Sequence, residues 1–419
     1  MSKFNKLNFT NSRLNQKNFY LYPLLENGFS KKDLNIGSKI LKTGLLTMGA
    51  VTRKFENDFA KKLGCKYALM TNSGSSANLL AAYAASNPLR KVRFKKNDEA
   101  LIPALCWPTS LWPLYQTGLK IKFIDIDVTT LNVNADDLIK NITKKTKVIM
   151  LINVLGLSTD VKKIISFAKK RKIIVIEDNC EALGGKLNNK YLGTFGDFGT
   201  FSFFYSHQIT SGEGGMVICN NKEDFKILVS LRSHGWSRGE EKDYINYSKK
   251  NPNLDPRYIF INQGFNLRPT EMQAGLAQNQ FRRLKKFVIK RSQNRIKIIQ
   301  SIKKNKKWNN QFEFITVPHN VSPSFMGLPV LMNERYINKK KTFINYLEQN
   351  GIETRPILTG SFLNQPAARL FQLNKNNKKK LINVQKVQDL GFLIGLHTKT
   401  INKKQIDLIT RCFLNIDNI

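Results

Sequence analysis

Apolar runs alternate with helix-like segments through the first half of the chain. A helical pattern is expected at 73–86 and an amphipathic helix at 160–171. Seven apolar runs predict buried strands: 66–72, 99–105, 120–127, 147–156, 172–179, 199–206 and 214–220. Strands that alternate with helices imply βαβ units. We therefore predict an α/β fold whose central, mostly parallel sheet lies between helices.

The second half begins with a long helical stretch that starts near Pro269. It is expected to lead into a smaller C-terminal α/β domain, with strands at 312–318 and 325–332 and a helix at 338–351 that ends at Gly351. We divide the chain into a polar N-terminal arm (1–20), a large domain (21–290) and a small C-terminal domain (291–419).

Composition places the chain among globular proteins. Of its 419 residues, 41% are hydrophobic and 23% are charged. No apolar run reaches the roughly 20 residues that a membrane-spanning helix needs, and the N-terminus lacks the apolar stretch of a signal peptide. We therefore expect a cytoplasmic protein that has no contact with membrane. The five cysteines include no CxxC pair, which argues against a disulfide framework and a structural zinc site.

The net charge of +38 raises the question of nucleic-acid binding. The lysines are spread along the chain, most densely in its second half, rather than gathered in a recognised motif. We therefore expect no nucleic-acid partner. A positive field would still attract a substrate that carries a diphosphate.

Three segments carry candidate chemistry. Residues 72–78 (NSGSSAN) join a strand to a helix, and backbone N–H groups at a helix start suit a phosphate, although Ser and Gly also form ordinary caps. The apolar run at 172–179 ends in acids, among them Asp178, which either pairs with a cation or caps a helix. Residues 202–215 place His207 between a hydroxyl-rich strand and a glycine-rich turn; a lone histidine is more often structural than catalytic.

The order of these three segments resembles the fold-type-I sugar aminotransferase family, which uses pyridoxal phosphate. That family typically carries, in the third segment, a lysine that joins the cofactor covalently. This chain has His207 at that position and no lysine between Lys190 and Lys222. Imidazole cannot form that lasting link, but it can move protons.

The chain resembles one His-bearing subgroup more closely, the GDP-4-keto-6-deoxymannose 3-dehydratases. The likeness runs from about Tyr22 to the C-terminus. It is carried by segments 22–24 (YPL), 47–49 (TMG), 69–75 (LMTNSGS), 204–207 (FYSH), 232–238 (RSHGWSR), 264–269 (GFNLRP) and 351–356 (GIETRP).

This resemblance implies a role for individual residues. Gly74, Ser75 and Ser202 would hold the cofactor phosphate, and Asn266 would reach it from a second subunit, which implies a homodimer. Trp107 would stack on the pyridine ring, unless it is a core residue. Asp178 would pair with the pyridinium nitrogen, and Glu181 would lie near the ring hydroxyl. Candidate substrate contacts, which could also be solvated surface groups, are Arg238, Arg268, Arg355, Glu353 and His234.

The resemblance also implies a reaction. Glutamate would convert the cofactor to pyridoxamine phosphate, and His207 would act in removing the C3 hydroxyl of a nucleotide-linked 4-keto sugar. Such sugars enter deoxysugar and lipopolysaccharide O-antigen synthesis. A second His-bearing subgroup holds an iron–sulfur cluster, but only Cys219 and Cys412 follow His207, so we expect no cluster. A sugar 4-aminotransferase and a non-catalytic relative remain as alternatives.

Overall fold

The computed structural model describes residues 20–26, 28–238, 241–373 and 381–419. Its central sheet has seven strands in the order β1-β9-β8-β5-β4-β2-β3. Neighbours from β8 to β3 are parallel, whereas β9 runs antiparallel to both β1 and β8. The predicted α/β fold with a mostly parallel sheet is confirmed. The strands are β1 (Tyr67–Thr71), β2 (Glu99–Pro103), β3 (Lys120–Ile124), β4 (Thr146–Ile152), β5 (Ile174–Asp178), β8 (Phe198–Ser202) and β9 (Gly215–Cys219).

Helices cover both faces of this sheet because successive side chains of a strand point to opposite sides. Leu69 and Val217 face a core shared with α4 (Gly74–Ser86), while Met70 and Met216 face a second core shared with α3 (Ala50–Leu63) and α10 (Glu271–Phe281). The buried alanines of α4 let that helix lie close to the sheet. Other helices of this region are α5 (Pro108–Gln116), α6 (Ala135–Lys140), α7 (Val161–Lys170), α8 (Lys222–Arg232) and the short η2 (Val154–Gly156).

The parallel strands end at one edge of the sheet, and this edge positions the candidate site. β5 ends at Asp178, β8 ends at Ser202, and β1 leads directly into the start of α4. Ligands of α/β proteins bind at this carboxyl edge. Three of the sequence segments with candidate chemistry therefore come together here, although they are far apart in the chain.

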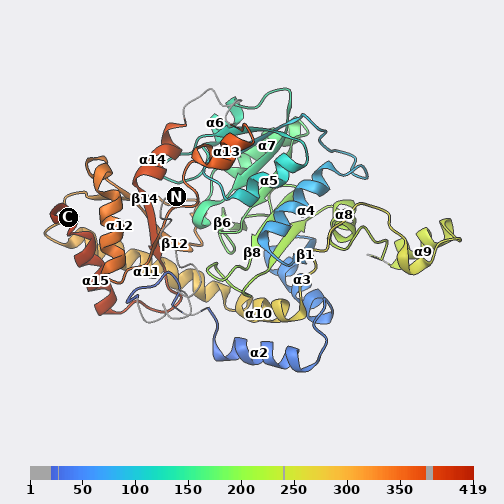
Figure 1. The fold of residues 1–419 in the computed structure, drawn as a ribbon, viewed down its shortest axis with the longest axis horizontal. Coiled ribbons are helices and arrows are strands. Elements are labelled where there is room, and N and C mark those ends of the chain that lie inside the picture. Colours follow the sequence, from blue (N-terminus) through green and yellow to red (C-terminus); the bar gives the residue numbers. More distant parts are fainter. Residues whose placement is uncertain (1–19, 27, 239–240, 374–380) are drawn as a thin grey trace, which may run out of the picture.

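A second sheet lies in the C-terminal part of the chain, at the left of Figure 1. Its strand order is β10-β12-β14-β13, and all of its pairings are antiparallel. These strands are β10 (Phe312–Phe314), β12 (Gly327–Met332), β13 (Thr354–Arg355) and β14 (Gly391–Gly395). The accompanying helices are α12 (Lys340–Gln349), α13 (Pro366–Leu370), α14 (Ile382–Leu390) and α15 (Lys403–Phe413), with short turns η4 (Glu334–Lys339), η5 (Phe362–Asn364) and η6 (Ile416–Asn418).

The long helical stretch predicted from Pro269 consists of two helices, α10 and α11 (Leu284–Lys304). The break falls at Arg282 and Arg283, where the Arg283 guanidinium pairs with Asp33 of α2 (Lys31–Lys42) at 2.7 Å. A tertiary ion pair of this kind leaves no trace in the local hydrophobic pattern. The predicted domain boundary at 290/291 falls within α11, and the division into domains stays a prediction. Nearly all of the predicted N-terminal arm lies outside the described residues.

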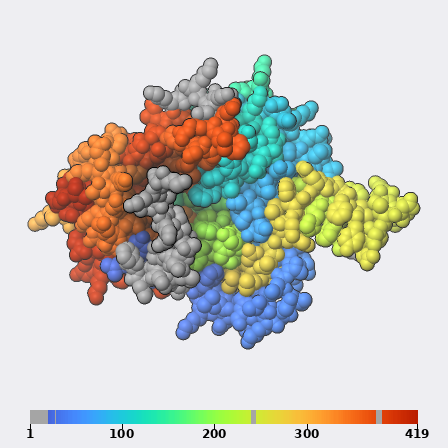
Figure 2. All heavy atoms as spheres, viewed as in Figure 1, coloured from blue at the N-terminus to red at the C-terminus, as the bar shows by residue number. Residues whose placement is uncertain are grey.

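Small elements complete the described chain. A three-stranded sheet joins β11 (Val321–Ser322), β6 (Lys186–Leu187) and β7 (Lys190–Tyr191). α9 (Glu241–Lys250), followed by η3 (Pro256–Tyr258), projects away from the body at the right of Figures 1 and 2. Within the described ranges, none of the helices combines the length and the apolar character required to span a bilayer.

Candidate active site

Gly74, Ser75 and Ser202 form a polar cradle at the start of α4. A Cβ atom on Gly74 would lie 2.4 Å from the Cβ of Ser202, so only glycine lets β8 approach the helix this closely. Ser73 caps α4 by accepting a hydrogen bond from the Ser76 amide. The Ser75 hydroxyl donates to Thr109 of α5 at 2.9 Å. A helix N-terminus ringed by serines suits a phosphate group.

Asp178 lies at the end of β5 and is almost fully buried. Its Oδ2 accepts hydrogen bonds from Asn78 Nδ2 and Ser110 Oγ, each at 2.7 Å, and its Oδ1 accepts from the Cys180 amide at 3.0 Å. These neutral donors fix the carboxylate without neutralising its charge. A protonated ring nitrogen is the kind of partner that such a buried carboxylate can take.

Glu181 follows Asp178 closely, and its carboxylate accepts a hydrogen bond from the Leu155 amide at 3.1 Å. Burial raises the pKa of Glu181 to about 7; the Leu155 amide opposes this shift and the charge of Asp178 adds to it. Near neutral pH, Glu181 can therefore either hold or accept a proton. This behaviour fits a group beside a titratable ring hydroxyl.

His207 lies in the loop between β8 and β9, where its amide donates to the Phe204 carbonyl at 3.1 Å. Its Nδ1 is buried and has no hydrogen-bond partner among the described residues. Burial lowers the pKa of the imidazole to about 4, while the backbone of Ser202 and the charge of Asp178 oppose the shift. The ring is thus neutral at pH 7 and can accept a proton.

These features test whether a pyridoxal-type cofactor suits the chain. The cradle at Gly74 would bind the phosphate of the cofactor. The carboxylate of Asp178 would pair with the protonated ring nitrogen, and the unpartnered Nδ1 of His207 would accept a reacting proton. The chemistry of this donor set fits the group. Each of these roles stays a prediction.

Trp107 is the N-cap residue of α5 and is 54% exposed, so it is not a core residue. The first turn of α5 also carries Thr109 and Ser110, which contact Ser75 and Asp178. The indole therefore stands at the mouth of the site. Its stacking on a cofactor ring remains a prediction.

Four other predicted residues gather around Trp236. His234 Nε2 lies 3.3 Å from an Arg268 nitrogen, and Arg268 Nε donates to Asn266 Oδ1 at 3.0 Å. The guanidinium groups of Arg238 and Arg268 lie 5.1 and 5.8 Å from the Trp236 ring centre. The Leu267 carbonyl accepts from the Asn72 amide at 3.1 Å, which places this cluster beside the residue that precedes the cradle. The contribution of Asn266 from a second subunit stays a prediction.

Glu353 and Arg355 form a separate pair, with an ion pair of 2.8 Å between them. Glu353 also accepts a hydrogen bond from the Leu24 amide at 2.8 Å, which ties it to the 22–24 segment. Both side chains thus have structural partners, and no described contact joins them to His207. Their role in substrate binding stays a prediction.

Three residues that the structure brings to the site were not predicted from the sequence. Asn78 and Ser110 hold Asp178, and Thr109 holds Ser75. Asn78 lies in the predicted phosphate segment 72–78, and Thr109 and Ser110 follow Trp107 closely in the chain. In the sequence, each of the three is only a polar residue at the start of a helix, close to a predicted site residue. Such residues are too common to be singled out as functional.

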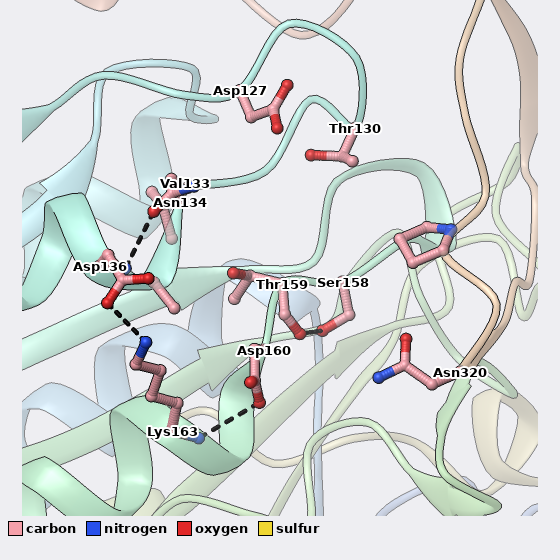
Figure 3. A pocket seen from close by; sticks show the side chains of 12 residues that line it. Asp127, Thr130, Val133, Asn134, Asp136, Ser158, Thr159, Asp160, Lys163 and Asn320 are labelled. Carbon is pink, nitrogen blue, oxygen red and sulfur yellow. Dashed lines mark hydrogen bonds and ion pairs between the residues drawn. The ribbon is translucent and has the colours of Figure 1, made fainter.

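A cavity of about 260 Å³ lies away from these residues, among the loops that follow β3 and β4 (Figure 3). Its wall includes Asp127, Asp160 and Lys163, and Asn320 approaches from the C-terminal part. Lys163 forms an ion pair with Asp136 at 2.5 Å. None of the predicted site residues lines this cavity.

Comparison with known proteins identifies the family. The profile of the DegT/DnrJ/EryC1/StrS aminotransferase family matches residues 29–412. The chain belongs to this family. It is 34% identical to a GDP-4-keto-6-deoxy-D-mannose 3-dehydratase from Yersinia pseudotuberculosis over 390 residues, which cover 92% of this chain and 95% of that protein.

Two solved structures extend the comparison. An Escherichia coli GDP-4-keto-6-deoxy-D-mannose-3-dehydratase with bound hydrated PLP superposes with a TM-score of 0.84 at 31% identity, covering 94% of this chain and all of that one. A GDP-4-keto-6-deoxymannose-3-dehydratase with a trapped PLP-glutamate geminal diamine superposes with a TM-score of 0.83, with the same identity and coverage. The resemblance to the 3-dehydratases within this aminotransferase family is confirmed.

Proposed function

We propose that this chain is a nucleotide-sugar 3-dehydratase that uses pyridoxal phosphate and pyridoxamine phosphate. Its substrate is a nucleotide-linked 4-keto-6-deoxyhexose, GDP-4-keto-6-deoxymannose in our proposal, and glutamate is the amino donor. The similarity to named 3-dehydratases supports the reaction. The observation that carries the proposal is His207, a partly buried imidazole whose Nδ1 has no described hydrogen-bond partner, in the position where an aminotransferase of this family carries lysine.

The site residues divide the work as follows. Gly74, Ser75 and Ser202 hold the phosphate of the cofactor, and Asp178 keeps its ring nitrogen protonated. When bound, the cofactor supplies an electron sink for cleavage next to the sugar C4 carbon. Glu181, with a pKa of about 7, can exchange a proton with the ring hydroxyl.

His207 carries the proton transfers. Because its imidazole is neutral at pH 7, His207 would accept a proton beside the bound cofactor and would then donate it to the departing C3 hydroxyl of the sugar. Glutamate provides two electrons and leaves as 2-oxoglutarate. The products are a 3-deoxy-4-keto sugar, ammonia and 2-oxoglutarate. A lysine at position 207 would compete for the cofactor aldehyde and favour transamination.

We propose a homodimer for the working enzyme, with Asn266 of each chain serving the partner's site. The projecting α9–η3 segment supports this arrangement, because Leu254 and Tyr258 on it are each more than half exposed, as is Phe260 just after it. Apolar side chains on a protruding arm are typical of a surface that another chain covers. We further propose a cytoplasmic enzyme in the synthesis of dideoxysugars for surface polysaccharides.

The proposed reaction is tested with a small panel of nucleotide 4-keto-6-deoxy sugars. Each is incubated with the protein, pyridoxal phosphate and ¹⁵N-labelled glutamate, and the products are read by mass spectrometry. We expect a sugar that has lost its C3 oxygen and contains no ¹⁵N, with labelled ammonia in solution. A product that retains ¹⁵N would identify a 4-aminotransferase. The absence of any absorbance change with cofactor and glutamate would identify a non-catalytic relative.

A further inference from the structure

Arg291 of α11 is a buried arginine that contacts the His207 loop. It is 2% exposed, and none of the described carboxylates forms an ion pair with it. Its guanidinium donates to three backbone carbonyl groups, those of His207 and Gln208 at 3.3 Å and that of Leu396 at 3.0 Å. The carbonyls of His207 and Gln208 are adjacent, so the two terminal N–H groups of the planar guanidinium bind the backbone at the candidate base itself.

Burying this charge is expensive for the protein. Burial lowers the pKa of Arg291 to about 10, yet the group remains protonated at neutral pH. A methionine or leucine of similar length could fill the same space without that cost. Packing therefore gives no reason for an arginine at this position, whereas the three carbonyl groups do.

Arg291 also joins the His207 loop to the C-terminal sheet. Leu396 directly follows β14, and Asn294, one turn further along α11, donates to the carbonyls of His397 and Lys399 at 3.0 and 2.7 Å. The next residue of the loop, Gln208, donates through its side chain to the carbonyls of Glu181 and Ser324. The loop is thus fixed between β5, α11 and the C-terminal part of the chain.

We infer that Arg291 is a positioning residue for the dehydration: it holds the backbone of His207 and aligns the imidazole with the reacting atoms. The inference rests on the proposed function, because it takes His207 as the proton-transfer group. A small displacement of such a group, of about 1 Å, can slow a reaction by ~10²-fold.

The charge of Arg291 has a second effect. The charged groups that act on the His207 imidazole are Asp178 of β5, which raises its pKa, and Arg291, which lowers it. Removing the positive charge therefore raises the pKa of His207 from about 4. A base with a higher pKa becomes protonated earlier as the pH falls, so the acid limb of the rate profile moves to higher pH.

Three variants separate position from charge. Arg291→Met removes both the positive charge and the hydrogen bonds to the backbone carbonyls. Arg291→Lys keeps the charge but loses the planar guanidinium that binds adjacent carbonyls. Arg295→Met is the matched control, because Arg295 lies on the same helix and donates to the Ile315 carbonyl at 2.5 Å, but makes no described contact with the His207 loop. The chain has only four histidines, so ¹³Cε1-histidine NMR can follow His207 in the full-length protein without cofactor, with His207→Asn for assignment.

We expect Arg291→Met to shift the His207 resonance and raise its pKa, and to lower kcat by ~10- to 100-fold while KM changes little. Arg291→Lys should shift the His207 resonance but leave the pKa of His207 near that of the parent. This variant decides the question if Arg291→Met fails to fold. Arg295→Met should resemble the parent. A His207 signal that is unchanged in both Arg291 variants, or changed equally in Arg295→Met, would overturn the role of Arg291. A parent protein without dehydratase activity would instead refute the proposed function and leave the NMR result standing.

Discussion

At the scale of single residues, the site combines groups whose protonation is set by burial. His207 is kept neutral, with a pKa of about 4, and Glu181 is raised to about 7. Asp178, three residues before Glu181, is held by neutral donors from Asn78 and Ser110. The same buried edge of the sheet therefore offers a base, a proton-exchanging acid and a fixed negative charge.

Replacing His207 by lysine should change the reaction. We expect His207→Lys to bind the cofactor covalently through its amine and to lose 3-deoxygenation, because the lysine amine recaptures the cofactor aldehyde. Borohydride reduction followed by intact mass measurement detects the link, and product analysis detects the lost activity. His207→Asn serves as the control that removes the base without adding an amine. Dehydration at the parent rate in His207→Lys would contradict the role of His207.

Replacing Asp178 by asparagine should weaken cofactor binding. The amide removes the negative charge opposite the ring nitrogen, and a hydrogen bond between charged groups contributes about 1.5–3 kcal/mol, so the dissociation constant should rise ~10- to 100-fold. Absorbance titration with pyridoxal phosphate measures it.

Glu177→Gln is the matched control for Asp178→Asn. The Glu177 carboxylate precedes Asp178 on β5 but accepts hydrogen bonds from the amides of Gly193, Phe195 and Gly196. This variant should lose stability and keep its affinity for the cofactor. Equal affinity in Asp178→Asn and the parent would mean that Asp178 does not pair with the ring.

At the scale of elements, one helix supplies the cap of another. The N-cap residue of α3 is Gly49, which has no side chain to accept a hydrogen bond. Glu271, the first residue of α10, takes its place: its carboxylate accepts from the amides of Gly49, Val51 and Thr52 at 2.7–2.9 Å and from the Thr52 hydroxyl at 2.6 Å. The negative charge also suits the positive end of α3. These hydrogen bonds join α3 and α10, the two helices that cover one face of the sheet.

Glu271→Gln should therefore destabilise the fold by about 1–3 kcal/mol, measured by urea unfolding at pH 7. Burial alone would raise the pKa of Glu271, but the hydrogen bonds from Thr52, Val51 and Gly49 outweigh it and lower the pKa. A lowered pKa in the folded state means that the stabilisation is present above the ordinary pKa of 4.5 and is lost as the pH falls below it. The difference between variant and parent should accordingly shrink in acid.

An exposed carboxylate provides the comparison for Glu271. Asp137 on α6 forms only a loose surface pair with Lys140 at 3.7 Å, so Asp137→Asn should leave the unfolding curve nearly unchanged. An equal and small effect of both substitutions would show that Glu271 does not cap α3.

At the scale of the whole molecule, the proposed dimer can be tested by subunit mixing. His207→Ala and Asn266→Ala chains should each be inactive alone. If Asn266 serves the partner's site, a hybrid dimer has one intact site, and random mixing should restore about a quarter of the parent activity. No recovery after mixing, with hybrid dimers verified by native mass spectrometry, would place Asn266 in the site of its own chain.

Local pattern was enough to predict the strands that build the parallel sheet and the helix after β1. The periodicity of apolar residues reflects backbone geometry, which is a local property. The same pattern could not reveal the break between α10 and α11, because that break coincides with the ion pair of Arg283 and Asp33, 250 residues apart. It also missed the end of β4 at Ile152, since the apolar run continues into the buried turn η2.

The sequence by itself determined that position 207 carries an imidazole, that no lysine lies between Lys190 and Lys222, and that a glycine–serine segment precedes a helix. Only the tertiary structure decided what surrounds these groups. Asn78 reaches Asp178 across 100 residues, and Arg291 reaches the His207 carbonyl across 84. Such contacts depend on how distant elements pack, and packing fixes the burial and charge that set each pKa. The chemical groups can thus be read along the chain, whereas their proton affinities and alignment arise from the fold.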